Sequence, residues 1–177
     1  MLRQVIAETP NSKWTDSGTL PMASARVVIA EDHPQYRELL CEQLRLSPDL
    51  EVVGEARDAW EAIAAVGKQA PDVLTLDLDL PGMSGLDVLR VVRWYSPKTQ
   101  VIMLSGHAEE EVVLEALKHG ARGYIVKGEG TDLAKAIRAV QRGEVWARRR
   151  VLARVLEELV GLASLTLSAT GGEPALA

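Results

Sequence analysis

The chain has 177 residues, 47% of them hydrophobic, which is enough for one well-cored domain with tails. Its formal net charge of −5 gives the chain as a whole no electrostatic basis for binding nucleic acid. No apolar run approaches the ~20 residues of a membrane span and no secretory leader pattern opens the chain, so we expect a cytoplasmic protein without a membrane anchor.

Residues 1–24 are polar and aperiodic, which predicts a flexible N-terminal extension. Five short apolar runs then alternate with five stretches of helical periodicity. Cys41, the single cysteine, lies in the first helical stretch and is expected to be a buried thiol. The strands are predicted at 26–30, 50–54, 73–77, 100–104 and 123–126, with helices from near Pro34, Asp58, Ser84 and Val112, and a last one capped by Thr131 or Asp132.

The strict alternation of strands and helices with short connections predicts an α/β domain over residues 25–143. It should be a doubly wound five-stranded parallel sheet with helices on both faces. Within the first helix, Tyr36, Leu39, Leu40 and Leu44 are expected on one inward face.

The pattern changes after Gly143. A linker helix is predicted over 144–163, in which Leu152, Leu156 and Leu159 form a short seam of the kind seen in coiled coils. Residues 164–177 are rich in Ser, Thr, Gly and Ala, and they indicate a flexible tail or a linker cut short.

Polar side chains stand where four of the five predicted strands end. They are Glu31 with Asp32, then Asp77, Ser105 and Lys127. Because the carboxyl ends of parallel strands meet at one edge, we expect these groups to share one rim. Three acids in one site repel each other by roughly 4 kcal/mol per pair at about 4 Å and an effective dielectric near 20, and a hard divalent cation such as Mg²⁺ would relieve this.

With the metal bound, Asp77 becomes a screened nucleophile that can attack an incoming phosphoryl group. The new oxyanions then need donors, which the Lys127 ammonium, the Ser105 hydroxyl and the backbone amide of Gly106 or Leu78 could supply. The residues together predict an aspartyl-phosphate site.

On these residues the chain resembles the receiver domain of two-component response regulators over roughly 26–143. The sequence is most similar to the NarL/FixJ-type subfamily at three segments, Ala30–Pro34, Pro81–Gly85 and Gly120–Tyr124. The resemblance implies the flavodoxin-like (βα)5 fold and phosphorylation of Asp77 by a sensor histidine kinase. It also implies a role in transcription regulation, in which DNA is bound only through a helix-turn-helix output domain. No helix-turn-helix pattern is found after residue 165.

The resemblance further assigns roles within the site. Mg²⁺ would be held by Glu31, Asp32, Asp77 and the backbone carbonyl of Asp79. Ser105 and Tyr124 would form the switch, while Asp79 and His107 would tune the lifetime of the phosphoryl group. The output surface would be the Val112–Leu117 helix with the fifth strand, and a homodimer could form there or through the linker helix.

Two other interpretations stay open at the level of sequence. Asp77 and Asp79 also resemble the Asp-x-Asp pair of haloacid-dehalogenase-type phosphatases, although that family places the pair after its first strand. A non-phosphorylated pseudo-receiver would keep the fold as a pure interaction module. We expect no turnover enzyme, since the phosphoryl group would be accepted on the chain's own aspartate.

Overall fold

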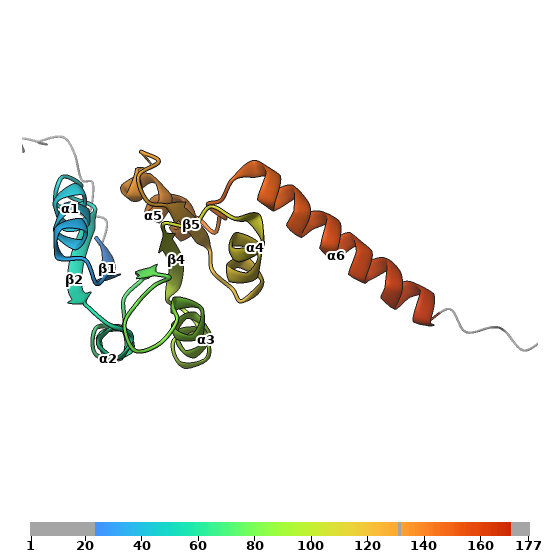
Figure 1. Ribbon diagram of the computed structural model, residues 1–177, viewed down its shortest axis with the longest axis horizontal. Helices are drawn as coiled ribbons and strands as arrows, with labels where there is room; N and C mark the ends of the chain where they lie inside the picture. Colours follow the sequence, from blue (N-terminus) through green and yellow to red (C-terminus); the bar gives the residue numbers. More distant parts are fainter. Residues whose placement is uncertain (1–23, 131, 171–177) are drawn as a thin grey trace, which may run out of the picture.

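The computed structural model describes residues 24–130 and 132–170. A single five-stranded sheet, in the order β2-β1-β3-β4-β5 with every neighbouring pair parallel, forms the centre of this part of the chain (Figure 1). The strands are β1 (Ala25–Ala30), β2 (Leu50–Ala56), β3 (Val73–Asp77), β4 (Gln100–Ser105) and β5 (Gly123–Val126). The helices are α1 (Pro34–Arg45), α2 (Ala59–Gln69), α3 (Gly85–Tyr95), α4 (Glu110–Lys118), α5 (Leu133–Gln141) and α6 (Arg149–Thr170).

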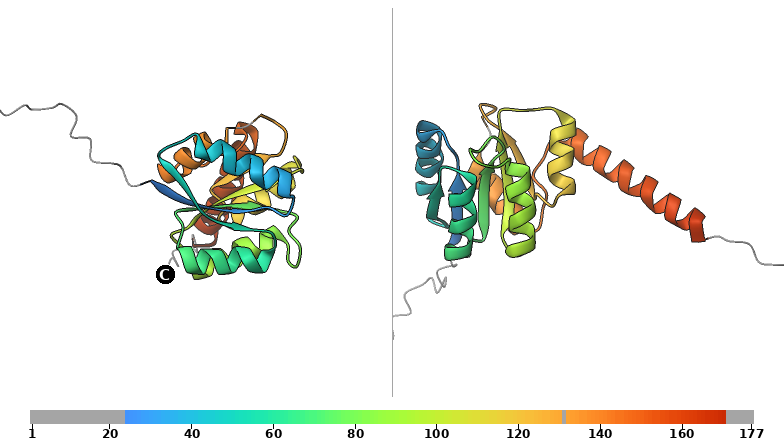
Figure 2. Two further views of the ribbon diagram at one scale, coloured as in Figure 1. Left: turned by 90° about the vertical axis from the view of Figure 1, so that its left-hand side faces the viewer. Right: turned by 60° about the horizontal axis from the view of Figure 1, so that its bottom comes forward.

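Both faces of the sheet are covered by helices, because successive strand residues point to opposite sides. Val27 and Ile29 pack toward α1 and α5, whereas Val28 packs toward α2, α3 and α4. Figure 2 shows the two helical layers with the sheet between them. The predicted doubly wound parallel α/β fold is therefore confirmed.

Side-chain caps set where three of the helices begin. Asp58 accepts a hydrogen bond from the amide of Glu61 at 2.8 Å, Ser84 caps α3, and Asp132 accepts from the amide of Lys135 at 3.0 Å. Asp132 is thus the cap of α5, while its alternative Thr131 lies outside the described residues, as does the predicted extension up to residue 23.

The inward face of α1 differs from the prediction at one position. Leu39 is 45% exposed, whereas Leu40, Cys41 and Leu44 are buried. The buried stripe is centred on the side of the helix that carries Cys41, so the leucine two residues earlier points toward solvent. The expected buried thiol is confirmed, and burial raises the pKa of Cys41.

The C-terminal helix differs from the predicted range 144–163 at both ends. The backbone of Trp146 pairs with the edge of β5, accepting from the amide of Tyr124 at 2.8 Å and donating to the carbonyl of Arg122 at 2.9 Å. This extended pairing delays the helix to Arg149. The helix then continues to Thr170, since no proline or glycine follows Gly161 until Gly171.

The first part of α6 packs against α4, and the ribbon of the helix then extends away from the domain (Figures 1 and 2). In the predicted leucine seam, Leu152 is half-buried and Leu156 is 63% exposed. Among the described helices, none combines the length and the hydropathy required to cross a bilayer.

Candidate functional site

The strand-end residues do meet at the carboxyl edge of the sheet. The Lys127 ammonium donates a hydrogen bond to Oδ2 of Asp77 at 2.7 Å and forms an ion pair with Oε2 of Glu31, also at 2.7 Å. Both carboxylates are buried, and Lys127 reaches them from the end of β5. The outer strand β5 thus supplies the cation for acids at the ends of the two central strands, β1 and β3.

Burial controls the protonation of this group. It raises the pKa of Glu31, and the hydrogen bond and charge of Lys127 only partly oppose the rise. Burial alone would lower the pKa of Lys127. The hydrogen bonds and charges of Asp77 and Glu31 outweigh this effect, so the pKa of the ammonium is raised. Lys127 is therefore held as a cation between two acids that it cannot both neutralise.

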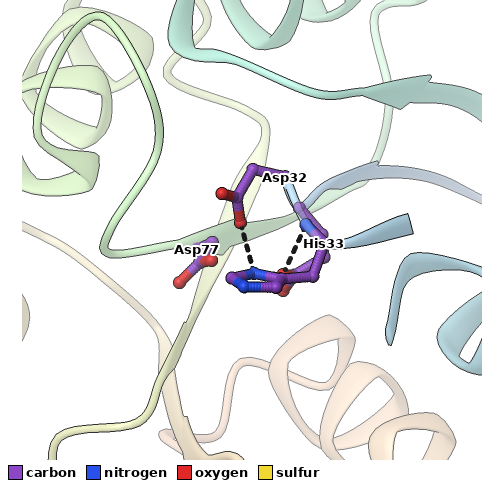
Figure 3. A group of neighbouring side chains, drawn as sticks. Asp32, His33 and Asp77 are labelled. Atoms are coloured by element: carbon purple, nitrogen blue, oxygen red, sulfur yellow. Dashed lines mark hydrogen bonds and ion pairs between the residues drawn. The ribbon is translucent and has the colours of Figure 1, made fainter. Parts of the chain in front are cut away.

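A third acid and an imidazole complete the acidic cluster, which consists of Glu31, Asp32, His33 and Asp77. One ligand atom from each of these residues lies within 4.8 Å of every other. Figure 3 shows Asp32, His33 and Asp77 grouped at this point. The Lys127 ammonium pairs with Glu31 and Asp77, and this one charge does not balance three carboxylates, so a bound cation would offset the remainder. An open site of carboxylate oxygens is the donor set that Mg²⁺ takes in proteins, and the residues present therefore fit that ion.

The cluster opens into a cavity of about 590 Å³. Asp79 lines this cavity, and its backbone amide donates to Oδ1 of Asp77 at 3.3 Å. Gly106 lines it as well, whereas the amide of Leu78 donates to the carbonyl of Leu104 at 2.9 Å. Of the two amides predicted as oxyanion donors, the one on Leu78 is thus already engaged in extending the sheet.

Ser105 and Tyr124 are joined through the loop that follows β4. The buried Ser105 hydroxyl accepts a hydrogen bond from the amide of His107 at 2.9 Å, and the Tyr124 hydroxyl donates to the carbonyl of the same residue at 3.1 Å. The Tyr124 ring lies inward, only 5% exposed, and burial raises its pKa. The two residues predicted to form the switch therefore both bond to the backbone of His107, one at its amide and the other at its carbonyl.

The two residues predicted to tune the reaction rate lie side by side at the rim. Nε2 of His107 is 3.4 Å from Oδ2 of Asp79, and Nδ1 is 3.6 Å from Oε2 of Glu109. His107 is therefore a loop histidine held between two carboxylates. Neither its proximity to Asp79 nor its contact with Glu109 follows from their positions in the sequence.

Two residues of the site were missed from sequence. The ring of Tyr36 lies 5.1 Å from the Lys127 ammonium, and Nδ1 of His33 lies 2.7 Å from Oδ1 of Asp32. Both follow β1 closely, in the connection to α1 and its first turn. Their positions just after an acid pair at a strand end were the available signal, because that stretch must pass over the carboxyl edge of the sheet.

A doubly wound parallel sheet with acids, a hydroxyl and a lysine at its strand ends defines a class of α/β signalling domains. Residues 27–138 match the model of the response regulator receiver domain, and the chain belongs to that family. It is similar to the "Probable transcriptional regulatory protein NarL" of Mycobacterium tuberculosis, with 41% identity over 113 residues. That match covers 63% of this chain and 52% of the relative, so the chain spans about half the length of the curated relatives it matches.

Solved structures agree with this assignment. The signal receiver domain of NarL from Mycobacterium tuberculosis superposes with a TM-score of 0.66 at 38% identity, covering 68% of this chain and 98% of that one. The isolated receiver domain of RcsB from Salmonella enterica serovar Typhimurium, solved with a phosphomimetic, gives 0.67 at 27% identity, covering 75% and 98%. The predicted receiver family and NarL-type subfamily are confirmed.

Proposed function

We propose that Asp77 accepts a phosphoryl group from a sensor histidine kinase. The observation that carries the proposal is the buried Asp77 carboxylate at the end of β3, held 2.7 Å from the Lys127 ammonium. An oxygen of Asp77 forms the new P–O bond as the P–N bond of a phosphohistidine breaks, and the leaving imidazole takes the electron pair of that bond. Lys127 then pairs with an oxygen of the transferred group.

The residues that would hold Mg²⁺ are Glu31, Asp32, Asp77 and the backbone carbonyl of Asp79. When bound, the ion supplies positive charge that lets an anionic phosphoryl group approach a site of three carboxylates. Buried Glu31 and Asp77 cannot turn away toward solvent, so they hold the oxygen ligands in place. The amide of Gly106, at the rim of the same cavity, would donate to the phosphoryl oxygens.

Phosphorylation would then shift an equilibrium between two arrangements of the β4–α4 loop. Ser105 would turn from the amide of His107 toward the phosphoryl group, and Tyr124 would follow because both hold the same loop residue. The differential contacts of the phosphoryl group supply the free energy of the shift. The surface formed by α4 and β5 would change as a result.

The output is proposed from similar proteins, which include a probable transcriptional regulatory protein and a DNA-binding transcriptional activator of Mycobacterium tuberculosis. A homodimer would form through α4 and β5 or through α6, and DNA would be bound only by an output domain outside this chain. Such a regulator works in the cytoplasm, and it turns over no external substrate because the phosphoryl group stays on its own aspartate.

Fluoroberyllate, which mimics a phosphoryl group on a carboxylate, tests the proposal. Thermal stability and molecular size should be measured with and without Mg²⁺ on the wild type, on Asp77→Ala, and on Asp87→Ala as a control at an exposed acid of α3. We expect Mg²⁺-dependent stabilisation in the wild type and in Asp87→Ala, with none in Asp77→Ala. A change in size together with stabilisation would identify dimerisation as the output. No stabilisation of the wild type would instead indicate a pseudo-receiver.

A further inference from the structure

His33 stands at the N-cap of α1 and does not cap it. Its backbone is extended, as is usual for a residue that precedes a proline, here Pro34. Its side chain makes no capping hydrogen bond. By contrast, the N-cap side chains of α2, α3 and α5 all accept a bond from their helix. The ring of His33 is thereby left for another partner.

That partner is the acidic cluster. Nδ1 of His33 lies 2.7 Å from Oδ1 of Asp32 and 3.4 Å from Oε1 of Glu31, and the residue's amide donates to that same Glu31 oxygen at 3.2 Å. Figure 3 shows the ring beside the carboxylates of Asp32 and Asp77. The side chain is 72% exposed, so an ion arriving from solvent meets the ring at the mouth of the cluster.

An imidazole nitrogen changes which metals such a site prefers. Mg²⁺ takes oxygen ligands, whereas imidazole suits Zn²⁺, Co²⁺ and other first-row ions. The cluster offers one imidazole nitrogen and three carboxylates within 4.8 Å of one another. We propose that His33 is a direct ligand through Nδ1, which makes this a mixed nitrogen and oxygen site that binds borderline transition-metal ions as well as Mg²⁺. The inference rests on the metal site of the proposed function.

If the ring had a different role, removing it would have the opposite effect on metal affinity. If His33 served only as a partner for Asp32, the imidazole would compete with every cation for that carboxylate. Removing the ring would then strengthen the binding of all divalent ions or leave it unchanged. If His33 is a ligand, removing its ring must lower the metal affinity, and the decrease must be found for ions that accept nitrogen ligands.

Calorimetric titration with Co²⁺ and with Mg²⁺ separates these cases. The variants are His33→Ala and, as a matched loss of one imidazole, His119→Ala, whose ring contacts the carbonyl of Glu115 at the end of α4. We expect His33→Ala to weaken Co²⁺ binding by about tenfold or more, with Mg²⁺ affinity held within about twofold. His119→Ala should bind both ions as the wild type does.

A spectroscopic measurement identifies the ligand directly. Mn²⁺ bound to the wild type should show nitrogen hyperfine coupling in pulsed electron paramagnetic resonance, and His33→Ala should lose it. Wild-type Co²⁺ affinity in His33→Ala, with no nitrogen coupling in the wild type, would overturn the inference and leave the Mg²⁺ site standing. If no divalent ion binds the wild type, or if Asp32→Asn binds Mg²⁺ unchanged, the metal site of the proposed function falls as well.

Discussion

Lys127 is the residue that allows two acids to be buried together at the end of the sheet. Glu31 and Asp77 are almost completely inaccessible, and both lie 2.7 Å from the same ammonium. Removing that ammonium would leave two buried carboxylates without a compensating charge, which is far more destabilising than losing an exposed ion pair. The charge that binds a phosphoryl group therefore also supports the folded state.

Asp79 extends the negative field of the site outward, since its carboxylate is 65% exposed at the rim. We expect Asp79→Asn to weaken Mg²⁺ affinity by about fivefold, the equivalent of ~1 kcal/mol for a carboxylate and a divalent ion about 8 Å apart in water. The same change should speed phosphorylation by an anionic small-molecule donor, because one repulsive charge is removed. Titration with Mg²⁺ and the rate of phosphorylation measure the two effects.

Salt and a control variant make that prediction specific. Both effects of Asp79→Asn should shrink as ionic strength rises, because the carboxylate is exposed and screened. Asp87→Asn, at an exposed acid that pairs with Arg90 on α3, should change neither quantity. If Asp79→Asn leaves both metal affinity and rate at wild-type values, the field of Asp79 has no part in the reaction.

At the scale of the elements, the sequence was most informative where a pattern was local. Apolar runs such as Val73–Leu76 identify strands buried on both faces, and a polar residue directly after such a run must lie at the carboxyl edge. This is why the grouping of Glu31, Asp77 and Lys127 could be predicted. His33 and Tyr36 come later, in the connection to α1 and its first turn, where the sequence indicates that the stretch passes over the edge but not which of its side chains point to the site.

Features that depend on distant partners could not be predicted. Leu39 fits the helical period as well as its buried neighbours do, and only the packing of α1 on the sheet places it outside. The extended stretch at Trp146 exists because the edge of β5 offers backbone groups to pair with. No local pattern marks either feature.

Gly85 makes the junction of β3 and α3 possible. A Cβ at this position would overlap the carbonyl oxygen of Asp77 and stand 2.8 Å from Cα of Leu78, both backbone atoms that cannot rotate away. We therefore expect Gly85→Ala to lower the free energy of unfolding by about 2–3 kcal/mol and to weaken fluoroberyllate binding, since Asp77 must shift. Urea unfolding and ligand titration measure the two losses.

Gly161 provides the matched control. A Cβ there meets no atom within 4 Å and the residue lies within α6, so Gly161→Ala should be neutral or stabilising by up to about 1 kcal/mol. Wild-type stability in Gly85→Ala would contradict the close approach of the helix to the end of β3.

At the scale of the whole molecule, α6 is attached to the element proposed to carry the output. Arg154 pairs with Glu110 and Glu111 of α4 at 3.2 Å, Arg150 pairs with Glu110, and Lys118 pairs with Glu158. Arg148 pairs with Glu129, in the loop that follows Lys127. The basic start of α6 is thus held by acids of the domain. Its attachment depends on the position of α4.

Val151 tests how strongly this attachment is coupled to the core. Its side chain is 1% exposed and belongs to the same apolar cluster as Tyr124, Val113 and Ala116. Because Val151→Ala removes two buried methyl groups from this cluster, we expect a loss of about 2 kcal/mol in the free energy of unfolding. Leu156→Ala, at a residue that is 63% exposed, should change the stability by less than about 0.5 kcal/mol.

Val151 and Tyr124 lie in one apolar cluster, so this buried contact is a candidate route between the switch and α6. A cavity in the apolar cluster that Val151 shares with Tyr124 loosens the packing of that cluster, so we expect Val151→Ala also to alter the stabilisation gained from fluoroberyllate and Mg²⁺. Arg154→Ala removes ion pairs at the surface of α4, which contribute little because water screens them, and it should leave that gain unchanged. Equal gains in the wild type and both variants would mean that α6 rests on α4 without sensing the switch. A changed gain in Val151→Ala alone would make the buried contact, rather than the ion pairs, the path from Asp77 to the C-terminal helix.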